Sequence, residues 1–359
     1  MRLGTCIALE LVCAVGAAAG VWVVAGRGVD LAGEYLQPEA SAATTTPASA
    51  AVTRLPSARL EVARPIGDTT VFEQPDELLL APLAATPLTG IKLNHGGTSL
   101  SLRVDFASGA RAAFKPQQIH PQSDPRREIA AYRIDRMLGI GHVAPAKSAT
   151  FALADLIAAA PADSRDYTTQ RLVDEAIVHD GKVSGEVSWW IPEIRDATIG
   201  THRVDEPEGM AEWVPYLQAG EPMPPELAGT MAQMSTMIVF DVLIDNADRW
   251  TGNNTKCSVD HETMYFMDNT LSFTQFTFGH ESNLTPLHRI SKFSRKLVTR
   301  LRTLTYASVA RALQTSDDPL APLLEPGEIR ALLARRDHLL RYIDGLSAEL
   351  GESAVLALP

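Results

Sequence analysis

An apolar segment close to the N-terminus sets the first limit on how this chain can fold. Residues 5–26 are almost all Ala, Val, Leu, Gly, Ile, Cys and Trp, and Glu10 is the only charged residue among them. A helix of this length just spans a bilayer, and the same composition suits the apolar region of a signal peptide. We therefore predict a signal peptide or transmembrane anchor at residues 1–27. An ordinary core helix is the alternative interpretation.

The stretch that follows has the composition of a tether. Residues 37–66 are rich in Ala, Ser, Thr and Pro and contain no aromatic residue. Such a segment buries too little apolar surface to order itself, so we predict a flexible linker at 28–69. The folded domain then starts near residue 70. We expect the protein to be a single-pass membrane-anchored or an exported protein, with the extracytoplasmic side favoured and the membrane as one partner.

Composition narrows the class of the folded part. Of the 359 residues, 45% are hydrophobic and 21% are charged, which favours a globular domain over a disordered chain. The net charge of −11 argues against a general nucleic-acid binder. The three cysteines are Cys6, Cys13 and Cys257, so the body of the chain holds only one. This excludes an internal disulfide scaffold and a cysteine-based structural zinc site.

Hydrophobic periodicity predicts strands first and helices later. Residues 100–106 and 110–116 alternate as the two strands of a hairpin, and residues 127–138 have helical spacing that Gly139 ends. The further elements that we predict are strands at 187–194 and 264–267 and helices at 231–243, 289–304 and 326–346. The predicted fold is α+β, with a small sheet-rich lobe at 70–195 and a larger helical lobe at 196–359.

A lysine and a glutamate form the first candidate site. Lys115 ends the second hairpin strand, and Glu128 lies on the helix that follows. An ammonium group on a strand can neutralise nucleotide phosphates, and a glutamate on the adjacent helix can orient it through an ion pair. The alternative is that both residues are ordinary solvated side chains.

Two acidic segments form the rest of the candidate site. A polar run begins at residue 245, directly after the apolar helix, and contains Asp248 and Asn253. Phosphoryl transfer needs a carboxylate that accepts the hydroxyl proton and a nearby side chain that holds a metal ion. Asp268 ends a short apolar strand and suits a divalent metal that bridges phosphates. Polar turns are the alternative in both places.

In this order, these residues resemble the atypical protein kinases of the secretory pathway, the Golgi casein kinase and four-jointed group. The similar blocks are FKP followed by REIAAYRIDRMLG, then VFDVLIDNADR, then FMDNT. More distantly, the chain is similar to HipA-type and phosphatidylinositol kinases. The resemblance implies a two-lobed kinase-like fold, ATP, and Mg²⁺ or Mn²⁺ as cofactor.

The resemblance also implies a role for each matching residue. Lys115 would bind phosphates, and Glu128 would be its partner and a possible metal contact. Asp248 would be the catalytic base, and Asp268 would be a metal ligand, with Asn253 as the second metal-binding candidate. A turn at Gly96 and Gly97 is the best candidate for a loop that covers the phosphates.

Two further features allow alternative interpretations. Trp189 and Trp190 either line an adenine pocket or belong to the core. A basic run within the helix expected at 289–304 either docks an acidic substrate or membrane head groups, or is a solvated helix face. The run comprises Arg289, Lys292, Arg295, Lys296, Arg300 and Arg302.

We predict a membrane-tethered or exported atypical kinase that transfers the γ-phosphate of ATP to a hydroxyl of a protein or glycan. Two alternatives remain open at this point. One is a catalytically impaired pseudokinase or nucleotide-binding scaffold, because Trp250 follows the Asp-Arg pair where His is frequent among the kinases it resembles. The other is a non-enzymatic envelope-anchored protein in which the polar segments are only turns.

Overall fold

The computed structural model covers the folded domain that the sequence predicts. The described residues are 70–94, 98–314 and 318–359. The anchor expected at 1–27, the linker expected at 28–69 and the turn at Gly96 and Gly97 lie outside them.

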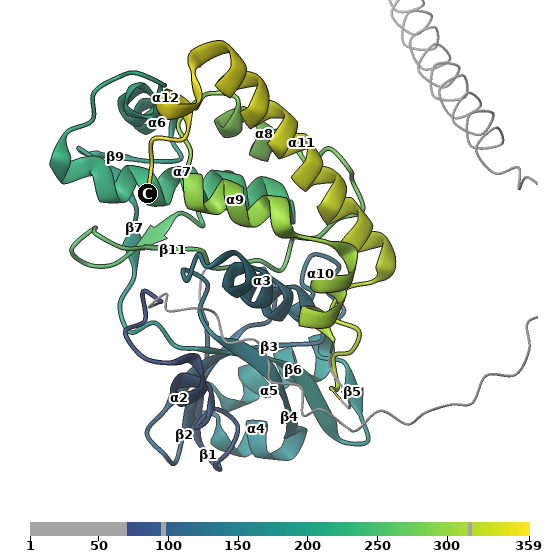
Figure 1. Cartoon of the computed structure of the whole chain (residues 1–359). Helices are drawn as coiled ribbons and strands as arrows, with labels where there is room; N and C mark the ends of the chain where they lie inside the picture. The colour runs from purple at the N-terminus through teal and green to yellow at the C-terminus, as the bar shows by residue number, and fades with distance from the viewer. Residues whose placement is uncertain (1–69, 95–97, 315–317) are drawn as a thin grey trace, which may run out of the picture. The chain divides into compact units, whose positions relative to one another are not determined.

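An antiparallel sheet occupies the N-terminal part of the described residues, with strand order β1-β2-β3-β6-β4 and with β5 paired to β6 (Figure 1). Its strands are β1 (Leu88–Leu93), β2 (Leu102–Phe106), β3 (Arg111–Pro116), β4 (Ala146–Ala152), β5 (Val178–His179) and β6 (Lys182–Trp189). The predicted hairpin is confirmed, because β2 and β3 pair antiparallel through four residues each. Strand β3 lies between β2 and β6, so its backbone is hydrogen-bonded on both sides and the direction of each side chain is fixed.

The two faces of the sheet have different neighbours. On one face, Phe114 of β3 is buried in the same core as Leu156 and Leu172, which come from α4 (Leu153–Ala159) and α5 (Arg165–Glu175). Because side chains alternate along a strand, Lys115 points to the opposite face. That face lies toward α3 and the rest of the molecule.

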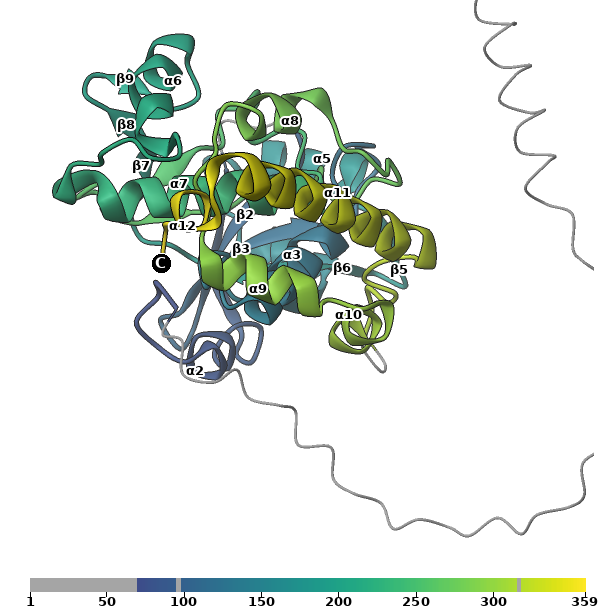
Figure 2. The same cartoon turned by 45° about the horizontal axis from the view of Figure 1, so that its top comes forward.

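Helix α3 (Pro125–Leu138) joins the sheet to the helices. Asp124 caps its N-terminus by accepting a hydrogen bond from the Arg126 backbone N–H, and Gly139 ends it in the left-handed conformation, at φ 65°. The apolar side chains of α3 belong to the helical core, although α3 also packs on β4 and β6. Figures 1 and 2 show α3 between the sheet and the helices α9 (Arg295–Thr303) and α10 (Tyr306–Leu313). Glu128 in the first turn of α3 thereby reaches Lys115 of β3.

Helices form most of the C-terminal part. They are α6 (Pro207–Trp213), η1 (Val214–Leu217), α7 (Pro225–Ile244), α8 (Glu281–Leu287), α9 (Arg295–Thr303), α10 (Tyr306–Leu313), α11 (Pro326–Leu350) and α12 (Glu352–Val355), and the short α2 (Asp76–Leu80) precedes the sheet. Among the described residues, α7 alone is long and apolar enough to cross a membrane. Its side chains from Met237 to Ile244 are buried in the helical core, which accounts for its apolar composition.

Short strands connect the two parts. Strand β10 (Lys256–Cys257) pairs with both β7 (Arg195–Asp196) and β11 (Met264–Tyr265), and β8 (Thr198–Ile199) pairs with β9 (His202–Arg203). The lobe boundary that we expected between residues 195 and 196 falls inside β7. We keep the division into lobes at 70–195 and 196–359 as a proposal, with β7 as the crossing point.

Several expected elements have different bounds in the structure. The helix expected at 231–243 is α7, which begins at Pro225, and the strand expected at 264–267 is β11, which ends at Tyr265. The strand expected at 187–194 is β6, which begins earlier and ends at Trp189, because polar residues in its first half hide the apolar pattern. The helix expected at 289–304 begins only at Arg295, where the Ser294 side chain caps it. The predicted basic run is therefore not one helix face. Lys292 is buried before the helix and donates to the Tyr216 carbonyl at 3.0 Å.

Candidate active site

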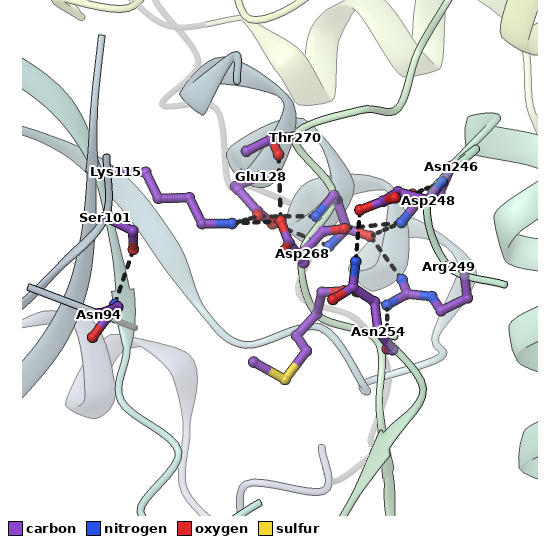
Figure 3. Close-up of polar contacts among 12 residues, drawn as sticks. Asn94, Ser101, Lys115, Glu128, Asn246, Asp248, Arg249, Asn254, Asp268 and Thr270 are labelled. Atoms are coloured by element: carbon purple, nitrogen blue, oxygen red, sulfur yellow. Dashed lines mark hydrogen bonds and ion pairs between the residues drawn. The ribbon is translucent and has the colours of Figure 1, made fainter. Parts of the chain in front are cut away.

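Lys115 lies at the centre of the site. Its Nζ is 2.6 Å from Glu128 Oε1 and 2.8 Å from Asp268 Oδ1, so one ammonium group joins the sheet, α3 and the loop after β11 (Figure 3). Burial by itself lowers the pKa of Lys115, but the Asp268 and Glu128 carboxylates more than offset this and raise it above its usual value. The lysine is therefore a fixed positive charge. The ion pair that the sequence predicts between Lys115 and Glu128 is present.

The loop that carries Asp268 is tied to α3. Glu128 accepts hydrogen bonds from the backbone N–H of Asn269 at 2.9 Å and from its Nδ2 at 3.1 Å. Asp268 itself has a left-handed backbone, with φ 60°, a conformation that is strained for most side chains and is tolerated best by Asp, Asn and Gly. Asp268 is thereby turned toward Lys115, and this ion pair lowers the pKa of its carboxyl group.

A second loop begins where α7 ends. Asp245 ends the helix with φ 58°, and Asn246 then donates from Nδ2 to the Asp268 carbonyl at 3.0 Å. The Asn246 Oδ1 accepts from the backbone N–H of Asp248 at 3.2 Å. These contacts hold the loop with Asp248 beside the loop with Asp268.

Arg249 stabilises the loop that carries Asp248 from its buried side. It is completely buried, pairs with Asp241 of α7 at 3.1 Å and donates to Asn269 Oδ1 at 3.0 Å. Burial raises the pKa of Asp241 to about 6, and Arg249 acts against this rise. Trp250 is also buried, where its ring lies 6.2 Å from that of Trp213. The residue after Arg249 is thus part of the core and does not line the site.

Asp248 is the carboxylate that faces this site from the second loop (Figure 3). Its Oδ2 accepts a hydrogen bond from Asn254 Nδ2 at 2.8 Å. Partial burial and then the Asp268 charge raise the pKa of Asp248, while Asn254 and nearby cations lower it. A Cβ at Gly252 would lie 2.2 Å from Asp248 Oδ1, so only glycine leaves the carboxylate in this place.

The candidate metal residue Asn253 lies in the cavity lining with an exposed side chain. It is the neighbouring Asn254 that contacts Asp248. We did not single out Asn254 from the sequence, where the consecutive asparagines at 253 and 254 give no basis for choosing between them.

Lys115, Glu128, Asn253 and Asp268 border one cavity of about 550 Å³, a size that suits a small-molecule ligand. Asp248 itself is not part of the lining, but Gly252 and Asn254, which hydrogen-bond to it, are. The polar end of the cavity contains Lys115, Glu128 and Asp268. Its other walls include the apolar residues Val143, Ala144, Ala146, Trp189, Trp190, Ile191, Pro192 and Met267. Asn94 and Ser101, joined by a 2.9 Å hydrogen bond, line it on either side of the β1–β2 turn. The tryptophans thus border the cavity, as one of the two interpretations of the sequence expected.

Glu186 is a residue of this cavity that sequence analysis missed. It lies on β6 directly across from Lys115 on β3, and its side chain is fully buried. Neither of its oxygens has a hydrogen-bond partner of good geometry among the described residues. Burial and the Glu128 charge raise the pKa of Glu186 to about 8, against Lys115, which lowers it. In the sequence, the signal for Glu186 is a single acidic residue within a segment that forms a buried strand.

The chemistry of these groups fits a divalent cation such as Mg²⁺ or Mn²⁺. Carboxylate and amide oxygens are the ligands that such hard cations prefer. The Asp268 side chain is 40% exposed and faces the cavity, so it is accessible to an ion. Among the described residues, no cluster of three or more His, Cys, Asp or Glu forms a complete metal site.

This chain is similar to several known proteins. Residues 222–355 match the family described as Golgi casein kinase, C-terminal, Fam20. Two similar relatives are glycosaminoglycan xylosylkinases. The one from Danio rerio is 24% identical over 318 residues, and the one from Homo sapiens is 22% identical over 310 residues. The matches cover 77% and 76% of this chain and the same shares of the relatives.

Solved structures show the same fold. A Golgi casein kinase with Mn/ADP bound has a TM-score of 0.62 at 18% identity and covers 81% of each chain. A hydra Fam20 structure with sugar has a TM-score of 0.57 at 18% identity, covering 77% of this chain and 90% of the other. These matches confirm that the chain resembles the atypical secretory-pathway kinases, and its fold is that of the Fam20 kinases.

Proposed function

We propose that this protein is a metal-dependent kinase that transfers the γ-phosphate of ATP to a hydroxyl group on a protein or glycan. The observation that carries the proposal is the position of Lys115 between Glu128 and Asp268, at the polar end of a cavity that the loop after Asp248 borders through Gly252, Asn253 and Asn254. A cation flanked by carboxylates that can hold metal is what the phosphates of a nucleotide require. The relatives named as kinases support the same conclusion.

Each side chain has a chemical task in this proposal. Lys115 neutralises the phosphates, and Glu128 fixes it in place. Asp268 and Asn253 would hold the metal, with Glu128 as a further possible contact. A bound Mg²⁺ or Mn²⁺ supplies charge neutralisation at the transferring phosphoryl group.

Asp248 would take the proton from the acceptor hydroxyl as the new O–P bond forms and the bond to ADP breaks. Its raised pKa suits a base, since a group with a pKa nearer neutrality binds a proton more strongly. Asn254 orients the carboxylate through its 2.8 Å hydrogen bond. Arg249, being completely buried, acts on the loop and does not reach the reacting groups.

The class of acceptor is a proposal that rests on the names of the relatives. Two relatives bear the name glycosaminoglycan xylosylkinase, and a structure with the same fold is a Golgi casein kinase. We therefore propose to test a xylose-containing glycan and casein. The membrane anchor or signal segment at 1–27 and an extracytoplasmic location remain proposals that rest on the apolar run at 5–26. Fractionation and N-terminal sequencing of the mature protein test them.

The decisive experiment has two stages on the full-length protein. First, thermal unfolding is measured with ATP, with Mn²⁺ or Mg²⁺, and with both, because a ligand of the native state raises the melting temperature. We expect a shift that needs both nucleotide and metal. Second, phosphate transfer from labelled ATP is measured with each acceptor. Binding without transfer to any acceptor identifies a pseudokinase, and no shift at all favours the non-enzymatic alternative.

Asp268→Ala tests the metal part of this site. We expect it to abolish metal-dependent nucleotide binding while the fold survives, because the side chain is 40% exposed and lies in the loop after β11. Isothermal titration calorimetry with ADP and Mn²⁺ measures the binding. Asp260→Ala is the matched control, since Asp260 is an exposed aspartate in a nearby turn. Equal ADP affinity in the Asp268→Ala variant and the wild type would show that Asp268 holds no metal.

A further inference from the structure

Glu186 is a buried carboxyl group at the polar end of the cavity that the proposed mechanism leaves unused. It is 0% exposed, and neither oxygen has a hydrogen bond of good geometry among the described residues, although the Ser188 hydroxyl lies close enough to lower its pKa. Burying such a group unpaired is costly, so native structures seldom keep one without a function. If stability of the fold were the only requirement, replacing the Glu186 carboxyl group by an apolar side chain would be favourable.

The strand register places Glu186 opposite a single cation. Lys115 of β3 pairs with Glu186 of β6, and cross-strand partners of this kind have side chains on the same face of the sheet. Lys115 is the cation whose charge acts on Glu186, and the other charges that act on it are the Glu128 and Asp268 carboxylates. Among the described residues, Lys115 is therefore the cation placed to pair with Glu186.

Lys115 has the capacity for a further acceptor. An ammonium group has three donors, and the contacts to Glu128 and Asp268 use two of them. Glu128 is fixed, because Asn269 donates to both of its oxygens. Asp268 is more exposed and faces the cavity, so it is the partner that a cation can draw away.

We propose that Glu186 is a positioning residue, which becomes the acceptor for the Lys115 ammonium when a metal ion engages the Asp268 carboxylate. This inference rests on the proposed function, because it needs a nucleotide and a metal in the cavity. Lys115 then has Glu128, Glu186 and a phosphate oxygen as its three acceptors. Without Glu186, the ammonium would remain with Asp268 and compete with the metal for that carboxylate.

The experiment compares Glu186→Met with Glu186→Gln in the full-length protein. Met keeps the volume and removes the polar oxygens, whereas Gln keeps one acceptor oxygen without the charge. Two quantities are measured: the melting temperature without ligand, and the Kd for ADP with Mn²⁺. We expect Met to raise the melting temperature and to weaken ADP binding about tenfold, which is the size of one charge-assisted hydrogen bond. We expect Gln to weaken it less.

Two further variants separate positioning from packing. Ser184→Ala is the matched control, since Ser184 lies on the same face of β6 but contacts Thr150 at an exposed edge. It should leave ADP affinity unchanged. In a Lys115→Met background, Glu186→Met should cause no additional loss, because its effect acts through the lysine.

The outcomes distinguish this inference from the proposed function. Glu186→Met with a raised melting temperature and wild-type ADP affinity would overturn the positioning role, as would a full additional loss in the Lys115→Met background. A wild-type protein that binds ADP with Mn²⁺ but transfers no phosphate would overturn the kinase proposal, and the binding data would still decide the role of Glu186. A wild type that binds no nucleotide overturns both.

Discussion

Asn254 donates a hydrogen bond from Nδ2 to Oδ2 of Asp248 across 2.8 Å, and this contact lowers the pKa of a carboxylate that its surroundings otherwise raise. Asn254→Ala should therefore raise the pKa of Asp248 further. A base works only when unprotonated, so the acidic limb of the kcat/KM profile should move to higher pH. Steady-state transfer rates between pH 5 and 9 measure this shift.

Two comparisons make the Asn254 result specific. Asp248→Asn should lower kcat by about 10²–10⁴-fold, with the nucleotide Kd unchanged, because it removes the base and keeps the cavity. Asn253→Ala should change the metal concentration needed and leave the acidic limb in place. An acidic limb that does not move in Asn254→Ala would show that Asp248 is not the group that titrates.

Position 252 requires glycine because the Asp248 carboxylate lies where a Cβ would be. Gly252→Ala would place a Cβ 2.2 Å from Oδ1, so the carboxylate must move. We expect kcat to fall by at least about tenfold with little change in nucleotide affinity, since small displacements of a catalytic group are costly. Gly229→Ala on α7 is the control, because a Cβ there meets no atom within 4 Å. It should stabilise the protein by about 0.5–1 kcal/mol and leave transfer intact.

Arg249 and Asp241 form a completely buried ion pair beneath the loop that carries Asp248. Arg249→Met leaves the Asp241 carboxylate without its partner, which should lower the free energy of unfolding by about 3–5 kcal/mol. Urea denaturation of the variant and the wild type measures the difference. Arg295→Met is the control, because Arg295 and its partner Glu352 are both exposed, and its effect should be within about 1 kcal/mol. Equal losses for the two variants would contradict a special role for the buried pair.

The raised pKa of Glu186 predicts a pH dependence of stability. The folded protein keeps a proton on Glu186 up to about pH 8, whereas the unfolded chain loses it near 4.5. The folded state thus binds more protons between these values, so the contribution of Glu186 to stability is full below about pH 4.5. It is lost as pH rises through about 8.

Denaturation of the ligand-free protein from pH 5 to 9 tests this, with Glu186→Gln as the reference. The free energy of unfolding of the wild type should fall relative to that of the Gln variant by up to about 1.4 kcal/mol per pH unit below pH 8. Parallel curves for the two proteins would show that Glu186 is already ionised in the folded state.

Local patterns in the sequence were sufficient for part of the fold. The hairpin of β2 and β3 follows from alternation around one turn, and α3 follows from helical spacing between a capping Asp124 and Gly139. The end of β6 and the start of α9 were wrong by several residues. Those ends depend on which segment packs where, and the extended segment before α9 is held by α12 and η1, which are far from it along the chain.

By itself, the sequence pointed to the four residues for which we propose roles: Lys115 and Glu128 lie in a strand and a helix that periodicity predicts, and Asp248 and Asp268 follow apolar segments. Only the tertiary structure decided how they combine. It chose Asn254 over Asn253 as the partner of Asp248, and it set Glu186 opposite Lys115. The physical reason is that a hydrogen bond or an ion pair depends on distances of about 3 Å between segments far apart in the chain, and strand register and helix packing fix those distances.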